Sequence, residues 1–183
     1  MALRKKKLKE GTQYGLPPLI EGTAEGIVIW RSLEGIDNEC LGYFLSCHLI
    51  IEHYTDKFLK DLHRELDWDS ARLTFTQKVT LISNLDMLET NCVPAIKHLN
   101  SLRNKLSHEI EFKIDTENLI PLRTFLTSSS KDNADIPSDV KGVLHLFTYR
   151  VCSWFAGWLS HSAYLTNQSP RNQNALRVQD KKS

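Results

Sequence analysis

The residues best suited to chemistry in this 183-residue chain are an arginine, an asparagine and a histidine in the segment LRNKLSH, residues 102–108. Arg103 carries a planar cation that keeps its charge and can bind two phosphate oxygens at once. Imidazole exchanges protons near neutral pH, so His108 could act as a general acid or base. Asn104 lies one helical turn before His108 and could fix the tautomer of its ring. Together these side chains are typical of a metal-independent ribonuclease, in which the 2′-hydroxyl of the RNA is the nucleophile.

The segment falls inside a helix that the sequence predicts from Pro94 to about residue 110, with proline in its favoured first turn. One stripe of this helix is apolar and predicted to be buried; it consists of Ile96, Leu99, Leu102, Leu106 and Ile110. Lys97, Asn104 and His108 gather on the opposite face, and Arg103 lies at the border between the two. The simplest interpretation is an ordinary solvated helix face. The chemical interpretation adds Lys97 and Lys105 as substrate-binding cations.

Two further charges are candidates for a supporting role because they fall on predicted inner faces. Glu52 lies within the apolar stripe of the preceding long helix, one turn after His48, and Lys78 lies on the inner side of the next helix. Buried charges are rarely left alone, so we expect Glu52 to pair with Lys78 or with Arg103. The pair would either fix helix register or position Arg103 for phosphate. Equal losses of melting temperature and activity in Glu52→Gln would exclude the positioning role.

Helical periodicity dominates the rest of the chain, and no convincing run of strand-like alternation is apparent. Helices are predicted at about 37–64, 75–90 and 139–165, with a capping box formed by Thr74 and Gln77. A short apolar piece lies at 118–126. The expected inner faces are these: Leu41, Phe44, Leu45, Phe58, Leu59 and Leu62; Phe75, Val79, Ile82 and Leu85; Val140, Leu144, Phe147, Val151, Trp154, Trp158 and Leu165. The fold class predicted is all-α, an up-and-down bundle of four to five helices.

Composition divides the chain into a central domain and two polar ends. Residues 1–20, with the basic run RKKKLK at 4–9, are predicted to be a flexible tail that could add salt-sensitive phosphate contacts. Residues 166–183 are predicted to be a disordered polar tail. The domain is expected to span 21–165.

The charge and cysteine content exclude several classes of protein. Lys and Arg number 23 against 22 Asp and Glu, so nucleic-acid binding would need a local patch rather than an overall positive potential. The four cysteines form no CxxC pair, which indicates reduced thiols. No secretory signal and no apolar stretch long enough for a membrane span are present, so we predict a cytoplasmic protein without a membrane partner.

Metal and nucleotide motifs are absent from the sequence. Neither the Glu-x-x-His of di-iron bundles nor a His-Glu-x-x-His occurs, and the glycines match no phosphate-binding fingerprint. No metal ligands and no cofactor are therefore expected.

The segment RNKLSH resembles the signature of the HEPN superfamily, an Arg followed by a polar residue, usually Asn, Asp or His, with a His four to six positions further on. The likeness extends upstream through residues 73–108 to the Phe-x-x-Lys stretch at 75–78, as in HEPN members related to the mannitol operon repressor. The preceding helix with its inward Glu52 is also similar, so the resemblance covers roughly residues 37–110.

The resemblance implies a helical bundle that dimerises and brings two Arg/His pairs into one cleft. Arg103 would hold the scissile phosphate, His108 would act as acid and base, and Asn104 would orient. Because Arg103 and His108 are about 140° apart on one helix, a single copy converges poorly on one phosphate, whereas two copies across a twofold axis could converge. Many members are endoribonucleases of toxin–antitoxin or phage-defence systems, which implies RNA and a protein antitoxin as partners.

Two alternatives to the nuclease remain open from the sequence. One is a non-catalytic HEPN-like module, similar to the mannitol operon repressor, whose motif face contacts a regulatory protein or a nucleotide. In the other the motif serves only dimer packing.

Overall fold

The computed structural model describes residues 19–24, 27–31, 37–85, 88–109, 112–129 and 135–168. The chain forms two compact units, one up to Asp37 and one from Asn38 onwards. The boundary falls later than the start at residue 21 expected for the domain. Most of the two predicted tails, 1–18 and 169–183, lies outside the described residues.

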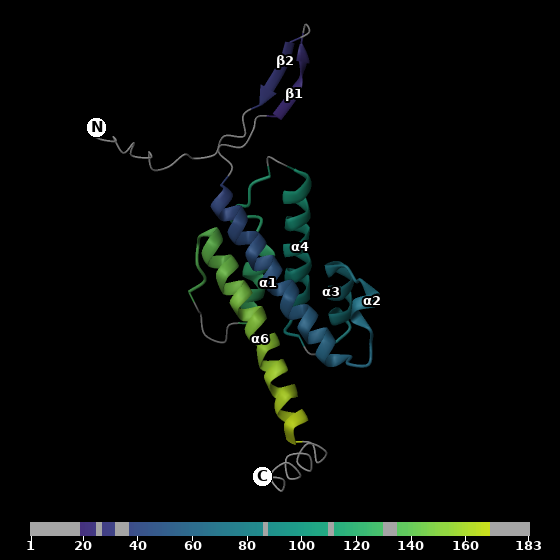
Figure 1. Ribbon diagram of the computed structural model, residues 1–183. Helices are drawn as coiled ribbons and strands as arrows, with labels where there is room; N and C mark the ends of the chain where they lie inside the picture. The colour runs from purple at the N-terminus through teal and green to yellow at the C-terminus, as the bar shows by residue number, and fades with distance from the viewer. Residues whose placement is uncertain are drawn as a thin grey trace, which may run out of the picture. The chain divides into compact units, whose positions relative to one another are not determined.

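The first unit contains a two-stranded antiparallel hairpin that the sequence analysis missed. Strand β1 spans Leu19–Ala24 and β2 spans Ile27–Arg31, with an irregularity between Ile20 and Gly22. The run of Ile27, Val28 and Ile29 was the available signal, because β-branched residues favour strands. The expectation of no strands, and of a tail reaching residue 20, was therefore wrong for this segment (Figure 1).

The second unit confirms the all-α bundle. It consists of α1 (Asn38–Leu62), α2 (Trp68–Ala71), α3 (Phe75–Ser83), α4 (Cys92–His108), α5 (Ile120–Ser129) and α6 (Val140–Gln168). The capping box of Thr74 and Gln77 is present at the start of α3. The short helix α2 was not predicted, and the apolar piece at 118–126 forms most of α5. Helix α6 continues through residues 166–168, which had been assigned to the C-terminal tail.

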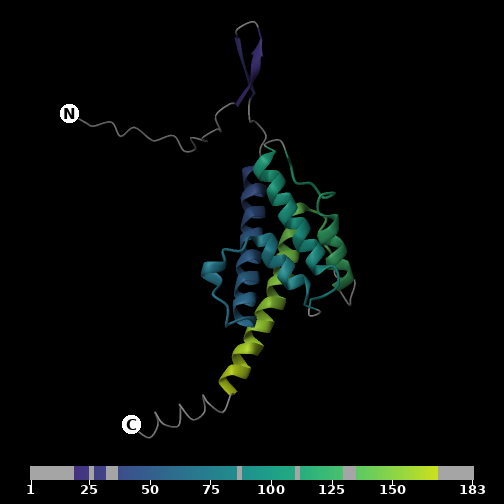
Figure 2. The ribbon, with the colours of Figure 1, turned by 90° about the vertical axis from the view of Figure 1, so that its right-hand side faces the viewer.

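Helices α1 and α6 pack side by side and run in the same direction. Lys141 contacts Glu39 at 2.6 Å, Tyr43 contacts His145 at 3.1 Å, and Arg64 contacts Ser162 at 3.1 Å, so the contacts advance together along both helices. Helices α1 and α6 are thus parallel (Figures 1 and 2). The expected up-and-down order is not kept between α5 and α6, because Arg123 near the start of α5 contacts Pro137 just before α6, and Arg150 on α6 contacts Ser129 at the end of α5.

The core follows the predicted inner faces with two exceptions. Leu45 is 37% exposed and Leu165 is 55% exposed, although both were expected inside. The Trp154 and Trp158 rings stack on each other and lie against Phe58, as expected for core residues. Ile110 lies outside the described residues. No helix in the described ranges combines the length and apolarity that crossing a bilayer demands.

Thr55 offers a test of packing in this core. Its side chain is fully buried in α1, and its hydroxyl has no hydrogen-bond partner among the residues that the structure describes. We expect Thr55→Val to raise the free energy of unfolding by about 1–2 kcal/mol, because valine keeps the volume and removes an unsatisfied polar group. Urea unfolding measures the change. Thr124→Val, at an exposed position where the hydroxyl donates to the Ile120 carbonyl, should change it little; a loss of stability in Thr55→Val would contradict the expectation.

Candidate functional site

The last turns of α4 present the Arg-Asn-His motif to solvent. Ile96, Leu99 and Leu102 anchor the helix in the core and are at most 2% exposed, as the sequence predicted. Arg103, Asn104 and His108 are all exposed. Each of the three side chains is therefore accessible to a ligand at this end of α4.

The contacts within the motif differ from those expected. The Nη1 of Arg103 donates to the Asn104 side-chain oxygen at 3.3 Å. Asn104 was predicted to orient His108, but its recorded contact is with Arg103, and no hydrogen bond or ion pair of His108 is found among the described residues. Within one copy of the chain, Asn104 therefore contacts the Arg103 guanidinium rather than the His108 imidazole.

The two lysines proposed to bind substrate are both exposed on α4. The Lys105 ammonium lies 5.5 Å from the centre of the Phe112 ring, a cation–π contact that holds it near the end of the helix. Lys97 lies nearly two turns before Arg103 on α4. Nucleic-acid binding by a chain of net charge +1 would need a local basic patch, and α4 offers Lys97, Arg103 and Lys105 as exposed cations for it.

A polar cluster lies between α1, α3 and α4, next to Arg103; we call His48, Glu52, Asp56, Thr76, Lys78 and Asn100 the inter-helix cluster. The His48 side chain is 4% exposed, and its Nε2 lies 3.1 Å from the Asn100 side-chain oxygen. The Asn100 amide in turn donates to the Thr76 hydroxyl at 3.0 Å. The imidazole also meets the edge of Phe75 at 4.9 Å between ring centres. One continuous set of contacts thus links all three helices.

The charged half of the cluster partly confirms the predicted pairing. Lys78 lies 3.9 Å from a Glu52 oxygen, so Glu52 does pair with Lys78, and no contact of Glu52 with Arg103 is recorded among the described residues. Asp56 is the closer partner, with 3.0 Å between its oxygen and the Lys78 Nζ. The Glu52 side chain is 33% exposed rather than buried, because it lies at the edge of the inner face. Asp56, one turn further along α1, was missed.

The cluster changes the protonation of two of its members. Burial lowers the pKa of His48, and the positive charge of Arg103 lowers it further, against the opposing effects of Asn100 and Glu52. Burial tends to raise the pKa of Asp56, but its contacts with Lys78 and Lys60 outweigh this and lower it. His48 is therefore neutral and Asp56 ionised at neutral pH.

The lowered pKa of His48 predicts a loss of stability in acid. The unfolded chain binds a proton at the ordinary imidazole pKa of about 6.5, whereas the folded chain binds it at His48 only at lower pH. The contribution of neutral His48 to the free energy of unfolding is therefore complete above about pH 6.5 and decreases as the pH falls below this value. We expect urea unfolding at pH 7.5 and 5.5 to show a smaller difference for His48→Gln than for the unmodified chain. His53→Gln, at an exposed position on the same helix, should keep the full difference. An unchanged difference in His48→Gln would contradict the prediction.

Sequence reasoning placed His48 beside Glu52 but missed Asn100, Thr76 and Asp56. The available signal was spacing: His48, Glu52 and Asp56 follow one another at helical turns, and Asn100 precedes Arg103 by three residues. No group of three or more metal-binding side chains is found in the described parts of the chain.

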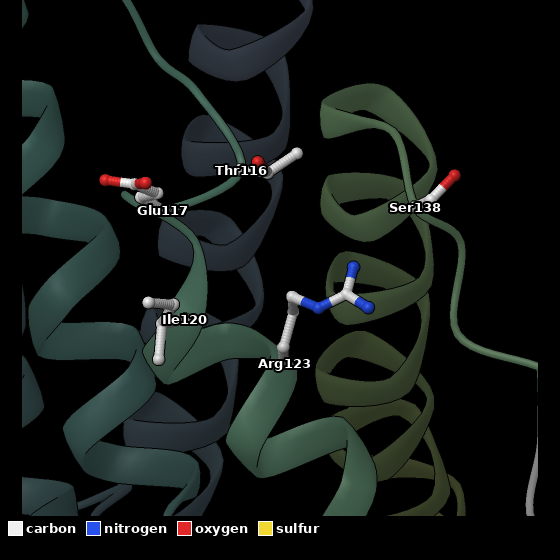
Figure 3. Close-up of a pocket in the computed structure, with 5 residues that line it drawn as sticks. All are labelled: Thr116, Glu117, Ile120, Arg123 and Ser138. Carbon is white, nitrogen blue, oxygen red and sulfur yellow. The ribbon is translucent and has the colours of Figure 1, made fainter.

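A separate shallow depression of about 350 Å³ lies at the start of α5. Its lining is Thr116, Glu117, Ile120, Arg123 and Ser138, none of which belongs to the predicted site (Figure 3). The Arg123 guanidinium donates to the Pro137 carbonyl at 2.6 Å, so it ties α5 to the segment before α6. We therefore assign this arginine a structural role.

Compared with known proteins, the chain matches no family model, no curated protein and no solved structure. Its function must therefore be inferred from its own residues.

Proposed function

We propose that this chain is a HEPN-like endoribonuclease that cleaves RNA without a metal ion and acts as a homodimer. The observation that carries the proposal is the exposure of Arg103, Asn104 and His108 together on the last turns of α4. Core packing occupies none of these side chains, so all three are available to a substrate. Lys97 and Lys105 on the same helix would contact neighbouring phosphates.

The proposed reaction is an attack by the RNA on itself. The 2′-oxygen bonds to the adjacent phosphorus as a histidine takes the 2′-hydroxyl proton, and the bond from phosphorus to the 5′-oxygen breaks as an imidazolium supplies that oxygen with a proton. The products are a 2′,3′-cyclic phosphate and a 5′-hydroxyl. Arg103 stabilises the charge that builds on the phosphoryl oxygens.

A dimer would bring an Arg103 and a His108 to the same phosphate, which a single copy does poorly. The side chains of Arg103 and His108 leave α4 about 140° apart, so a phosphate held by Arg103 of one copy would meet His108 of the other. In this arrangement the His108 that takes the 2′-hydroxyl proton then supplies it, as an imidazolium, to the departing 5′-oxygen. A toxin–antitoxin or phage-defence role, with a protein antitoxin as the inhibitor, belongs to the same proposal.

A second candidate is a non-catalytic module that binds a regulatory protein. The exposed apolar side chains of α1 favour it, since Leu49 is 62% exposed and Ile50 is 46% exposed. Exposed apolar groups that neighbour one another are typical of protein contact surfaces. If the chain has this function, the hydrogen-bonded side chains of Arg103 and Asn104 would recognise the partner protein.

The test is incubation of the purified full chain with RNA and with a 2′-O-methylated RNA of the same sequence, both in excess chelator. We expect cleavage of the unmodified RNA alone, with 2′,3′-cyclic phosphate ends identified by mass spectrometry. Cleavage of the methylated RNA, or a requirement for added Mg²⁺, would contradict the mechanism. Absence of cleavage in a broad pool of RNA would favour the second candidate.

A further inference from the structure

The chain leaves α4 in a way that brings an aromatic ring to the end of this helix. The backbone N–H of Glu109 donates to the Lys105 carbonyl at 2.8 Å and closes the helix, and the backbone of Glu109 is extended. The N–H of Phe112 then donates to the Glu109 carbonyl at 3.0 Å, so the chain turns immediately after α4. Phe112 thereby meets the Lys105 ammonium, which lies 5.5 Å from the centre of its ring.

The Phe112 ring is accessible on the side where the lysine lies. It is half-buried and packs against the core, whereas Lys105 is exposed and lies over the ring. A cation–π contact at an exposed position is weak. A phosphate is the stronger partner for an ammonium because both groups are charged. Binding of a phosphate would therefore draw the flexible lysine side chain aside and uncover the ring.

The proposed acid and base neighbours this pair of side chains. His108 follows Lys105 by three residues on α4, a spacing at which side chains meet on the helix surface, and both are exposed. A phosphate bound by Lys105 and a base on Phe112 would thus belong to the part of a strand that adjoins the imidazole.

Charge alone would give this end of α4 little selectivity among anions. The exposed carboxylate of Glu109, one turn after Lys105, opposes the binding of a phosphate, whereas the exposed ammonium of Lys113 favours it. An aromatic ring adds a different kind of contact, because a nucleobase stacks on it and an inorganic anion does not. The pairing of a lysine with a ring therefore fits a ligand that carries both a phosphate and a base.

We propose that Lys105 and Phe112 form a nucleotide subsite beside His108, in which the ammonium binds a phosphate and the ring stacks on a nucleobase of the same strand. The ligand is single-stranded RNA, since the bases of a duplex are already paired and stacked on one another. The subsite deepens the function proposed above and rests on its RNA binding, not on its cleavage step. Because every base has a flat π face, the contact adds affinity without strong sequence preference.

Fluorescence anisotropy on the full chain tests the stacking contact with two labelled probes. One is a single-stranded 2′-O-methylated RNA, which lacks the nucleophile, and the other is an abasic oligonucleotide of the same length and backbone. We expect the unmodified chain to bind the base-bearing probe about five- to a hundredfold more tightly. Phe112→Leu should lose most of this preference and bind the abasic probe as before, whereas Phe112→Tyr should keep it. Equal affinities of the unmodified chain for the two probes, or the full preference in Phe112→Leu, would overturn the proposal.

Lys105→Met tests the phosphate contact on the same two probes. We expect it to weaken the binding of both by the same factor and to reduce the salt dependence by about one phosphate contact. Lys57→Met, at an exposed position on α1, is the matched control and should change neither probe. A loss confined to the base-bearing probe in Lys105→Met would contradict the assignment of the ammonium to a phosphate.

NMR on the unmodified chain answers the question even if Phe112→Leu does not fold. The ring proton signals of Phe112, assigned by their loss in Phe112→Tyr, should move further upfield with the base-bearing probe than with the abasic one. Identical responses to both probes would mean that no base stacks on this ring. If the chain binds the base-bearing probe in this way but cleaves no unmodified RNA, the nuclease proposal fails and the subsite stands.

Discussion

His108→Ala is expected to lower RNA cleavage by about 10²–10⁴-fold, the contribution typical of a general acid or base, with no change in the urea midpoint. The loss of cleavage should come without a loss of stability because the His108 side chain is exposed at the end of α4. Arg103→Ala should lower cleavage comparably, because phosphate would lose its bidentate cation. Cleavage rate and unfolding are measured on the same preparations. His53→Ala, an exposed histidine on α1, is the matched control and should cleave as the unmodified chain does.

A mixture of the two inactive proteins tests whether the site is shared between copies. If a phosphate lies between Arg103 of one copy and His108 of the other, Arg103→Ala and His108→Ala chains combined should regain part of the activity. Full activity of His108→Ala, with purity established by mass spectrometry, would remove the imidazole from the mechanism. Inactivity of each variant with no recovery on mixing would place both side chains of one copy at the same phosphate.

The sequence predicted the elements that depend on a single helix. The buried stripe of α4, with Ile96, Leu99 and Leu102, follows from the 3.6-residue period alone, and so does the exposure of Asn104 and His108. The same reasoning failed at Leu45 and Leu165, which remain exposed on their helices. A wheel shows which residues share a face but not whether another helix covers that face.

The contacts between helices could not be predicted in this way. The bond between His48 and Asn100 depends on the approach of α1 to α4, which their periodicities leave open. Lys78 was expected to face Glu52, yet the closer carboxylate is Asp56, one turn away, because the position of α3 along α1 decides the pairing. The hairpin was missed for another reason, since its short strands give a weaker signal than long amphipathic helices.

The packing of α6 against α1 depends on the side chain of Phe58. Its ring is fully buried and lies 5.2 Å from Phe155, 5.5 Å from Trp154 and 5.6 Å from Trp158, measured between ring centres. These aromatic contacts hold the later half of α6 against α1, and α6 continues from there to Gln168 (Figure 2). Removal of the ring would leave a cavity lined by three aromatic side chains, which cannot collapse to fill it.

We therefore expect Phe58→Ala to lower the free energy of unfolding by about 3–5 kcal/mol, the range found when a buried phenylalanine is truncated. Domains of this kind are stable by only about 5–15 kcal/mol, so the variant should unfold at a much lower urea concentration. Tyr149→Ala is the control on α6, since that ring is 65% exposed and its loss should cost little. A loss below about 1 kcal/mol in Phe58→Ala would mean that α1 and α6 are not held together by this aromatic cluster. Because the motif is carried by α4, a folded Phe58→Leu variant should still cleave RNA at the unmodified rate, and this separates the packing of α6 from the chemistry proposed for Arg103 and His108.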